Sequence, residues 1–370
     1  MRKRSPSGGL FPYAPAKSSC VEPKTRETPR ETAMRAYEMS AAAGLDSWKS
    51  AERPTPEPGR GQVLVRMRAA SLNYRDLLIC QGRYPFAVNL DRLIPLSDGA
   101  GEIVALGAGV RRFTGGERVA GIFSQSWLGG AQVSDTWQTA LGGAIDGVLT
   151  EYQVFDEDGL VTLPDHLSFE EGATLPCAAV TAWNALYGLK PLRAGETVLT
   201  LGTGGVSIFA IQLAHAAGAR VIATSSSDDK LEKARALGAH DTINYRTHPD
   251  WEGEVRRLTG GTGVDHVVEV GGTGTLPRSI ASTRPGGHIG LIGLLAQGEA
   301  FDPLAILGAS CIVRGVAVGP REMFEDMNRS IALHGIKPVI DRVYGFDEAP
   351  AALKALAEAG HVGKIVIRID

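Results

Sequence analysis

The sequence has few cysteines and no long apolar run. Its four cysteines, Cys20, Cys80, Cys177 and Cys311, are widely separated and form no CxxC pair. This spacing argues against a disulfide framework or a structural zinc lobe and favours a reducing compartment. No apolar stretch reaches the roughly 20 residues that a membrane-spanning helix needs. The net charge is only −3, which indicates neither a nucleic acid nor an anionic membrane as partner. We therefore expect a cytoplasmic protein.

Several catalytic patterns are missing as well. The eight histidines form no pair with metal-ligand spacing, and no Ser-His-Asp or Cys-His arrangement is visible. His288 lies within an apolar strand segment, where we expect a structural role. These absences disfavour nucleophilic hydrolases and histidine-ligated metal sites.

The chain has 370 residues, of which 44% are hydrophobic and 21% charged, as in ordinary globular proteins. This length suits about two domains. Residues 1–33 differ from the rest, with five prolines and seven Lys or Arg against three Glu. They show no helix or strand period, and we expect a disordered N-terminal extension without function. A targeting role is the alternative.

The periodicity changes along the chain. Residues 34–165 are rich in short strands and turns, with an irregular stretch at 124–147. Residues 166–320 alternate between helix and strand patterns, which predicts a parallel sheet with helices on both faces. Residues 321–370 return to helix and strand at the end of the chain. The predicted class is α/β, with a β-rich domain and a doubly wound parallel sheet.

A glycine-rich turn follows the strand segment that ends at Leu201. It contains Gly202, Thr203, Gly204, Gly205 and Val206, and a helix-period pattern continues from it. A strand, a tight turn and a helix in this order present backbone N–H groups to a diphosphate, so we expect these turn residues to bind a dinucleotide. Ser207 stands where a third glycine is usual. The alternative is a glycine-rich turn that binds no nucleotide.

Several motifs occur in a characteristic order: GERVAG, GTGGVS, KARALGA, INYR, GVDHVVEV, GGHIGLIG and GHVGKIVI. In this order they resemble medium-chain dehydrogenases/reductases over essentially all of residues 34–370. The resemblance implies a GroES-like catalytic domain at 34–165, completed by 321–370, and a Rossmann NADP-binding domain at 166–320. It also implies an active site in the cleft between them.

Zinc divides this family into branches. The zinc-dependent branch has a cysteine where this chain has Asn73, and a His-Glu pair where it has Ser97 and Asp98. Only its third ligand coincides with a cysteine here, Cys177, and a catalytic zinc needs three protein ligands. The chain therefore resembles the zinc-free quinone-oxidoreductase-like branch. We expect no zinc and interpret Cys177 as a small buried apolar residue.

The end of the second Rossmann strand bears on the choice of cofactor. NAD enzymes usually have an acidic residue there, whereas this chain has Ser225, which a 2′-phosphate would tolerate. Lys230 and Tyr245 reproduce the spacing of the pair that flanks the adenosine phosphate in the resembling quinone reductases. Asp228 and Asp229 argue mildly against a phosphate site. We expect NADP (NADPH).

The same resemblance assigns further residues to the cofactor. Thr181 starts the helix that faces the nicotinamide in the resembling proteins. Gly293 and Leu294, at the end of the strand segment that contains His288, are also expected to contact the cofactor.

Without a metal, charge on the substrate oxygen must be stabilised by positioned donors. Asn73, Tyr74 and Asp76 are the candidate catalytic residues: an amide donor, a donor of a proton or hydrogen bond, and a carboxylate that orients them. Asp76 has a second interpretation, as the cap of the helix that follows.

The expected function is zinc-independent hydride transfer from NADPH to a quinone or an α,β-unsaturated carbonyl. The alternatives are a zinc-free alcohol/aldehyde dehydrogenase and a non-catalytic NADPH-binding protein. The expected partner is a small-molecule substrate, in a cleft lined by residues 123–146 and 293–301. The Val-rich stretch 312–318 resembles the strand through which this family pairs its sheets, so we expect a homodimer.

Overall fold

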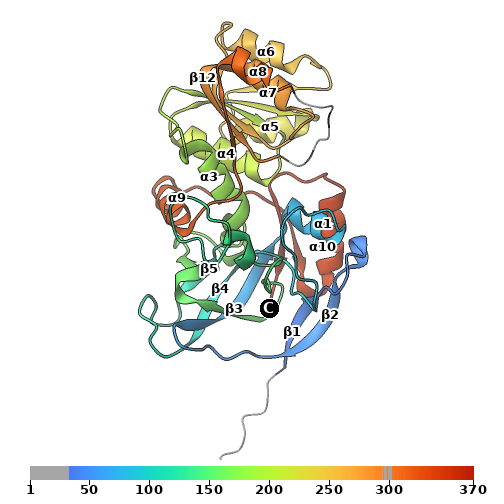
Figure 1. The fold of residues 1–370 in the computed structure, drawn as a ribbon, viewed down its shortest axis with the longest axis vertical. Helices are drawn as coiled ribbons and strands as arrows, with labels where there is room; N and C mark the ends of the chain where they lie inside the picture. Colours follow the sequence, from blue (N-terminus) through green and yellow to red (C-terminus); the bar gives the residue numbers. More distant parts are fainter. Residues whose placement is uncertain (1–32, 294, 296–297, 299–301) are drawn as a thin grey trace, which may run out of the picture. The chain divides into compact units, whose positions relative to one another are not determined.

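The computed structural model describes residues 33–293, 295, 298 and 302–370. The expected disordered extension therefore lies outside the described residues except for Ala33, and so does Leu294. Ala33 already belongs to the first strand, one residue before the expected boundary. The described chain contains two larger sheets and a two-stranded ribbon (Figure 1).

The N-terminal half of the described chain is mostly β-structure with short helices. Its strands are β1 (Ala33–Glu38), β2 (Lys49–Pro54), β3 (Gln62–Ser71), β4 (Asp98–Leu106), β5 (Arg118–Gly121), β6 (Tyr152–Asp156) and β7 (Leu160–Thr162). Its helices are η1 (Gly44–Asp46), α1 (Tyr74–Cys80), η2 (Thr136–Thr139), η3 (Glu157–Gly159), α2 (Phe169–Gly172), the π-helix η4 (Leu175–Ala179) and α3 (Val180–Tyr187).

The middle of the chain alternates strand and helix, as the periodicity predicts. Its elements are β8 (Thr197–Leu201), α4 (Gly205–Ala216), β9 (Arg220–Ser225), α5 (Asp228–Ala236), β10 (Asp241–Asn244), α6 (Trp251–Leu258), β11 (Val264–Glu269), α7 (Leu276–Ser282), β12 (Thr283–Leu291), α8 (Leu304–Ala309) and β13 (Ile312–Gly315). The C-terminal elements are α9 (Arg321–His334), β14 (Ile340–Gly345), η5 (Phe346–Glu348), α10 (Ala349–Ala357) and β15 (Lys364–Arg368).

The six middle strands form one parallel sheet in the order β10-β9-β8-β11-β12-β13. The order reverses direction between β8 and β11, which is where doubly wound sheets bind their ligands. Helices α3 and α4 cover one face, and α6 and α7 pack on the other (Figure 1). Most of the buried strand residues are aliphatic, and they point to both faces because both faces are covered, as the near-continuous apolar runs predict. The predicted Rossmann-type sheet is confirmed.

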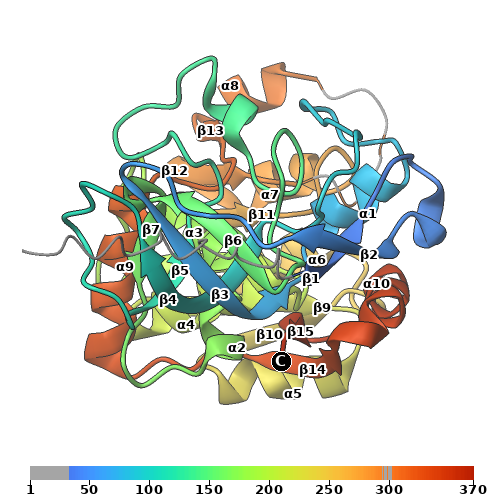
Figure 2. The ribbon, with the colours of Figure 1, turned by 90° about the horizontal axis from the view of Figure 1, so that it is seen from below.

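The second sheet combines strands from both ends of the chain. Its order is β14-β15-β3-β4-β5-β7, and β6 also pairs with β3. Strand β15 lies antiparallel to β3, with Val366 opposite Ser71, so the C-terminal strand begins beside the segment that leads into α1 (Figure 2). The β-rich class is confirmed, while the exact domain boundaries stay a prediction.

The irregular stretch at 124–147 contains only the short helix η2, as expected. His288 lies in β12, fully buried opposite His266 of β11, and burial lowers its pKa to about 4. A neutral side chain in the sheet agrees with the structural role expected for it. No helix within the described ranges is long and apolar enough to cross a membrane.

Candidate active site

The glycine-rich turn joins β8 to α4 at the point where the strand order reverses. Gly202 has a φ of +71°, in the left-handed region that favours glycine. Gly204 caps α4, and a Cβ added to it would meet no atom within 4 Å. Backbone N–H groups at the first turn of α4 have no helical partner and carry the positive end of the helix dipole. The turn is therefore suited to a diphosphate.

Ser207, where a third glycine is usual, has a local explanation. Its buried hydroxyl donates to the carbonyl oxygen of Leu201 at 2.7 Å, so it closes the end of β8 while the helix stays close to the strand. The turn also contacts the C-terminal segment, because Gly363 N donates to Thr203 O at 3.0 Å. A Cβ on Gly205 would lie 2.7 Å from Cδ of Lys364.

Two of the three residues expected at the adenosine phosphate lie at the ends of neighbouring strands, and the third, Lys230, lies in α5. Ser225 is buried at the end of β9, and its carbonyl accepts the N–H of Tyr245 at 3.0 Å. The Tyr245 side chain is exposed just after β10. Lys230 Nζ is 3.4 Å and 3.5 Å from the carbonyl oxygens of Ala359 and His361. These are long contacts, which an anion could replace at little cost.

The acidic residues near this cluster do not all face it. Asp228 accepts the side-chain amide of Asn244 at 2.8 Å, so this carboxylate has a partner of its own. Asp228 and Asp229 are exposed in the first turn of α5, where carboxylates are stabilised by the helix dipole.

Two further residues expected at the cofactor have defined surroundings. Thr181 is buried in the first turn of α3. A Cβ on Gly293 would lie 2.3 Å from the backbone nitrogen of Gly272, so the loops after β11 and β12 touch there and only glycine fits. Val206 is half-buried in α4.

The candidate catalytic residues begin α1. Asn73 is the residue before the helix, and its backbone N–H donates to Oδ2 of Asp76 at 2.7 Å. Both are buried, whereas Tyr74 is half-buried. Asp76 does not precede the helix as its N-cap. It lies in the first turn of α1, and its side chain forms part of a capping box with Asn73, which is the N-cap residue. The hydrogen bond from its backbone N–H holds Asn73 in place, so Asp76 orients this residue through its backbone.

Asp98 at the start of β4 is fully buried beside Asn73. Its carboxylate accepts Ser97 Oγ at 2.7 Å and the backbone N–H of Cys177, in the π-helix η4, at 3.0 Å. Burial raises the pKa of Asp98, and the charge of Lys364 is the strongest influence that opposes the rise. Burial also raises the pKa of the Cys177 thiol well above its usual range, so this residue is a neutral thiol.

Arg75 and Tyr84 also belong to this corner, and the sequence patterns did not identify them. The Arg75 guanidinium lies 4.9 Å from the centre of the Tyr84 ring and 3.6 Å from Oδ1 of Asp76. Burial raises the pKa of Asp76 to about 6, although Arg75 opposes this, and burial raises that of Tyr84. The Arg-Asp sequence is a common pattern for a solvated helix start, so only burial distinguishes it here.

Lys364 also belongs to this corner, and the sequence patterns did not identify it either. It begins β15, distant in sequence from Asn73, yet it is buried and its ammonium donates to Oδ1 of Asn73 at 2.5 Å. The only signal in the sequence is a lysine that starts an apolar strand. We define the corner as Asn73, Arg75, Asp76, Tyr84, Asp98, Cys177 and Lys364.

The side chains of the corner are poorly suited to bind zinc. Among the residues that the structure describes, no group of three or more His, Cys, Asp or Glu side chains is arranged to hold a metal ion. At the three positions where the zinc-dependent branch has its ligands, the chain has an amide that accepts from an ammonium (Asn73), a hydroxyl (Ser97) and a protonated thiol (Cys177). These are poor ligands for Zn²⁺ as they stand. The expected absence of zinc stays a prediction.

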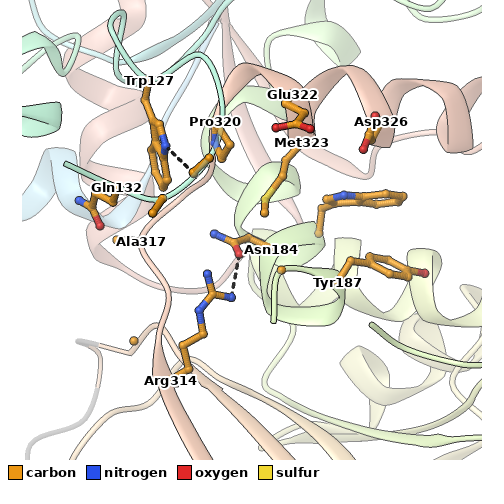
Figure 3. Close-up of a pocket in the computed structure, with 15 residues that line it drawn as sticks. Trp127, Gln132, Asn184, Tyr187, Arg314, Ala317, Pro320, Glu322, Met323 and Asp326 are labelled. Carbon is orange, nitrogen blue, oxygen red and sulfur yellow. Dashed lines mark hydrogen bonds between the residues drawn. The ribbon is translucent and has the colours of Figure 1, made fainter. Parts of the chain in front are cut away.

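A cavity of about 540 Å³ is lined by residues of the irregular stretch, α3, β13 and α9 (Figure 3). Trp127 and Gln132 of the irregular stretch line it, as do Asn184 and Arg314, which are joined by a hydrogen bond of 3.0 Å. None of the expected catalytic residues lines this cavity. The part of the cleft expected at 293–301 lies largely outside the described residues.

The comparisons with known proteins agree with this geometry. Residues 59–165 match the alcohol dehydrogenase GroES-like domain family, and residues 205–332 match the zinc-binding dehydrogenase family. A zinc-type alcohol dehydrogenase-like protein of Schizosaccharomyces pombe is 45% identical over 89% of this chain and 97% of its own length.

Two solved structures extend the comparison. A putative alcohol dehydrogenase from Sinorhizobium meliloti is 42% identical, has a TM-score of 0.85 and aligns over 91% of this chain and 99% of its own. A quinone oxidoreductase from Pseudomonas syringae is 26% identical, has a TM-score of 0.77 and aligns over 91% of this chain and 100% of its own.

Proposed function

We propose a specific reaction from one premise: the chain belongs to the medium-chain dehydrogenase/reductase superfamily and is an NAD(P)-dependent oxidoreductase. The proposal is zinc-independent reduction of a quinone or an α,β-unsaturated carbonyl with NADPH. It rests on one observation above all. The corner at Asn73 contains fixed hydrogen-bond donors and an internal ammonium instead of a set of metal ligands.

The corner supports chemistry that avoids a Lewis acid. Bound NADPH supplies a hydride, and the substrate carbon that accepts it leaves negative charge on a conjugated oxygen. In a quinone or enone this charge is delocalised, so hydrogen bonds from Asn73 and Tyr74 suffice to stabilise it. A proton must then reach the oxygen or the α-carbon, and the Tyr74 phenol is the candidate donor. Asp76 keeps Asn73 at the start of α1 through its bond to the backbone.

The choice of NADPH is supported by the residues at the end of β9. No carboxylate occupies the position of Ser225, and Lys230 has only long contacts to carbonyl oxygens. Tyr245, whose backbone N–H donates to the carbonyl oxygen of Ser225, has an exposed side chain. A 2′-phosphate would gain charge-assisted hydrogen bonds in this cluster. The glycine-rich turn would hold the diphosphate for either cofactor.

The direct test measures NADPH oxidation by the purified protein against quinones, enones and aldehydes, before and after prolonged chelation. We expect consumption with quinones or enones, unchanged after chelation, and no stoichiometric zinc by elemental analysis. Activity confined to aldehydes and alcohols would replace the proposal with the dehydrogenase that the names of several relatives suggest. Cofactor binding without turnover on any substrate would favour a binding protein, and about one zinc per chain would overturn the metal-free reaction.

We also propose a homodimer formed through β13. This strand ends the parallel sheet, and one of its edges has no neighbouring strand among the described residues. Ile312 on it and Leu304 and Leu307 on α8 are exposed, which gives the edge an apolar border. Light scattering should give twice the mass of one chain, and a mass of one chain would contradict the proposal.

A further inference from the structure

Lys364 connects the two regions of the proposed active site. Its aliphatic part packs against Gly205 in the first turn of α4, and its ammonium reaches the start of α1. There it donates to the carbonyl oxygen of Leu72 and to Oδ1 of Asn73. The side chain is 4% exposed, although lysine is among the residues that are rarely buried. A buried lysine in this place needs a physical reason.

The hydrogen bond to Asn73 has a fixed direction. An ammonium can only donate, so the amide atom that faces Lys364 must be the oxygen. The opposite orientation would place amide hydrogens against ammonium hydrogens. The Asn73 amide nitrogen therefore points away from Lys364. This nitrogen lies near the Asp98 carboxylate, whose ionised form it stabilises, but makes no close hydrogen bond among the described residues. An amide nitrogen carries two hydrogens, so at least one of them is available.

The charge of Lys364 is not neutralised by direct contact. Within the described ranges no carboxylate oxygen lies within ion-pair distance of its Nζ, and its two partners are neutral oxygens. Its nearest charged influences are Asp98 and Asp76, which it stabilises in their ionised forms. A buried cation without a direct counter-ion is costly. It also projects positive potential into the corner where the substrate oxygen would become negative.

We propose that Lys364 is a positioning residue of the active site, which holds the Asn73 amide by its oxygen so that an N–H group is left for the substrate, and which supplies fixed positive charge behind it. The inference rests on the proposed function. It adds a residue that acts through Asn73 and explains how donors can stay oriented without a metal. No covalent step is assigned to Lys364.

The test compares three variants of the full-length protein. Lys364→Met keeps the length of the side chain but removes donor and charge, and Lys364→Arg keeps both. Lys337→Met removes a half-exposed lysine that pairs with Glu171 and serves as the control for loss of a lysine. Turnover with the best quinone or enone, NADPH affinity and thermal stability are measured for each.

We expect Lys364→Met to lower kcat at least about 10-fold, because misplacement of a reacting group is costly. Lys364→Arg should recover part of this loss, Lys337→Met should retain wild-type turnover, and NADPH affinity should change less than about 3-fold. In a double variant with Asn73→Ala, the Lys364→Met substitution should cost much less turnover than it does alone, because the orientation of Asn73 is already lost and only the charge remains to be removed. A loss of NADPH affinity with unchanged kcat, or additive losses in the double variant, would overturn the proposal.

A second measurement does not depend on activity. The side-chain NH2 signals of Asn73 in ¹⁵N NMR are identified by their absence in Asn73→Asp. They should shift in Lys364→Met and stay near their original place in Lys364→Arg and Lys337→Met. Unchanged signals in Lys364→Met would overturn the positioning role even if turnover falls. If none of the tested substrates supports NADPH oxidation by the wild-type protein, the proposed reaction fails. The NMR signals of Asn73 still decide in that case whether Lys364 orients the amide.

Discussion

The glycine-rich turn and the corner around Asn73 are assembled from different parts of the chain. The turn takes backbone groups from the consecutive residues 202–207, and its side chains are small. The corner takes side chains from α1, β4, η4 and β15, with carboxylates and cations buried together. The turn depends on local conformation, whereas the corner depends on the pairing of the first and last strands of one sheet. The two regions should therefore respond differently to substitution.

The largest expected effect is a loss of turnover that leaves cofactor binding nearly unchanged. Asn73→Ala and Tyr74→Phe should each lower turnover on the order of 10²-fold, because loss of one donor to a developing oxyanion typically costs that much. NADPH affinity, measured by fluorescence titration, should be nearly unchanged because the turn is intact. Tyr344→Phe, far along the chain on β14, is the control. Full turnover in both corner variants would reduce Asn73 and Tyr74 to pocket lining.

The buried charges of the corner should appear in the pH dependence of stability. The folded-state pKa of Asp76 is about 6, above its ordinary value of 3.8. Its ionisation therefore disfavours the folded state: the penalty is absent below about pH 4, grows between pH 4 and 6, and is complete above. Each pKa unit corresponds to about 1.4 kcal/mol, so about 2 to 3 kcal/mol is involved.

This penalty disappears in Asp76→Asn, which keeps an acceptor for the backbone N–H of Asn73. The unfolding free energy of this variant, minus that of wild type, should rise between pH 4 and 7. This trend is expected whether the variant is more or less stable than wild type at pH 4. Urea unfolding at several pH values measures the trend. If the difference in unfolding free energy between the variant and wild type were constant across this range, the pKa of Asp76 would not be raised in the folded state.

Two adjacent glycines provide the sharpest contrast between the regions. A Cβ on Gly205 would meet Cδ of Lys364 at 2.7 Å, so Gly205→Ala should destabilise the fold by about 1 to 3 kcal/mol. Gly204 has open space, so Gly204→Ala should leave the melting temperature within about a degree. It should instead weaken NADPH binding, because the added methyl group occupies the space proposed for the diphosphate. Equal melting temperatures for the two variants would contradict the packing of Lys364 on the turn.

The smallest expected effect concerns the choice between cofactors. The unmodified protein should bind NADPH at least about 10-fold more tightly than NADH, or about 1.4 kcal/mol. Ser225→Asp should erase or invert this preference by placing a carboxylate against the 2′-phosphate, while turnover at saturating cofactor changes little. Equal or tighter binding of NADH by wild type would refute the NADP assignment.

The elements were largely predictable because their signals are local. The alternation of strand and helix over residues 166–320 was expected, since each strand of the parallel sheet is a short apolar run that ends in a turn. Two differences have physical reasons. Strand β12 begins at Thr283, earlier than its apolar core, because Pro285 and the following glycines still fit at a strand start. A helix was expected to follow Asp76, whereas α1 already begins at Tyr74, because its polar first turn lacks the apolar period.

The sequence by itself determined the fold class, the position of the dinucleotide turn and the residues at the ends of β9 and β10. Each of these depends on neighbours along the chain or on the order of strands. The tertiary structure alone decided the corner: Asp76 in a capping box, the burial of Arg75, Tyr84 and Asp98, and the contact of Lys364 with Asn73. A charged residue looks the same in sequence whether water or protein surrounds it. Its burial follows only from the antiparallel pairing of β15 with β3, which brings residue 364 next to residue 73.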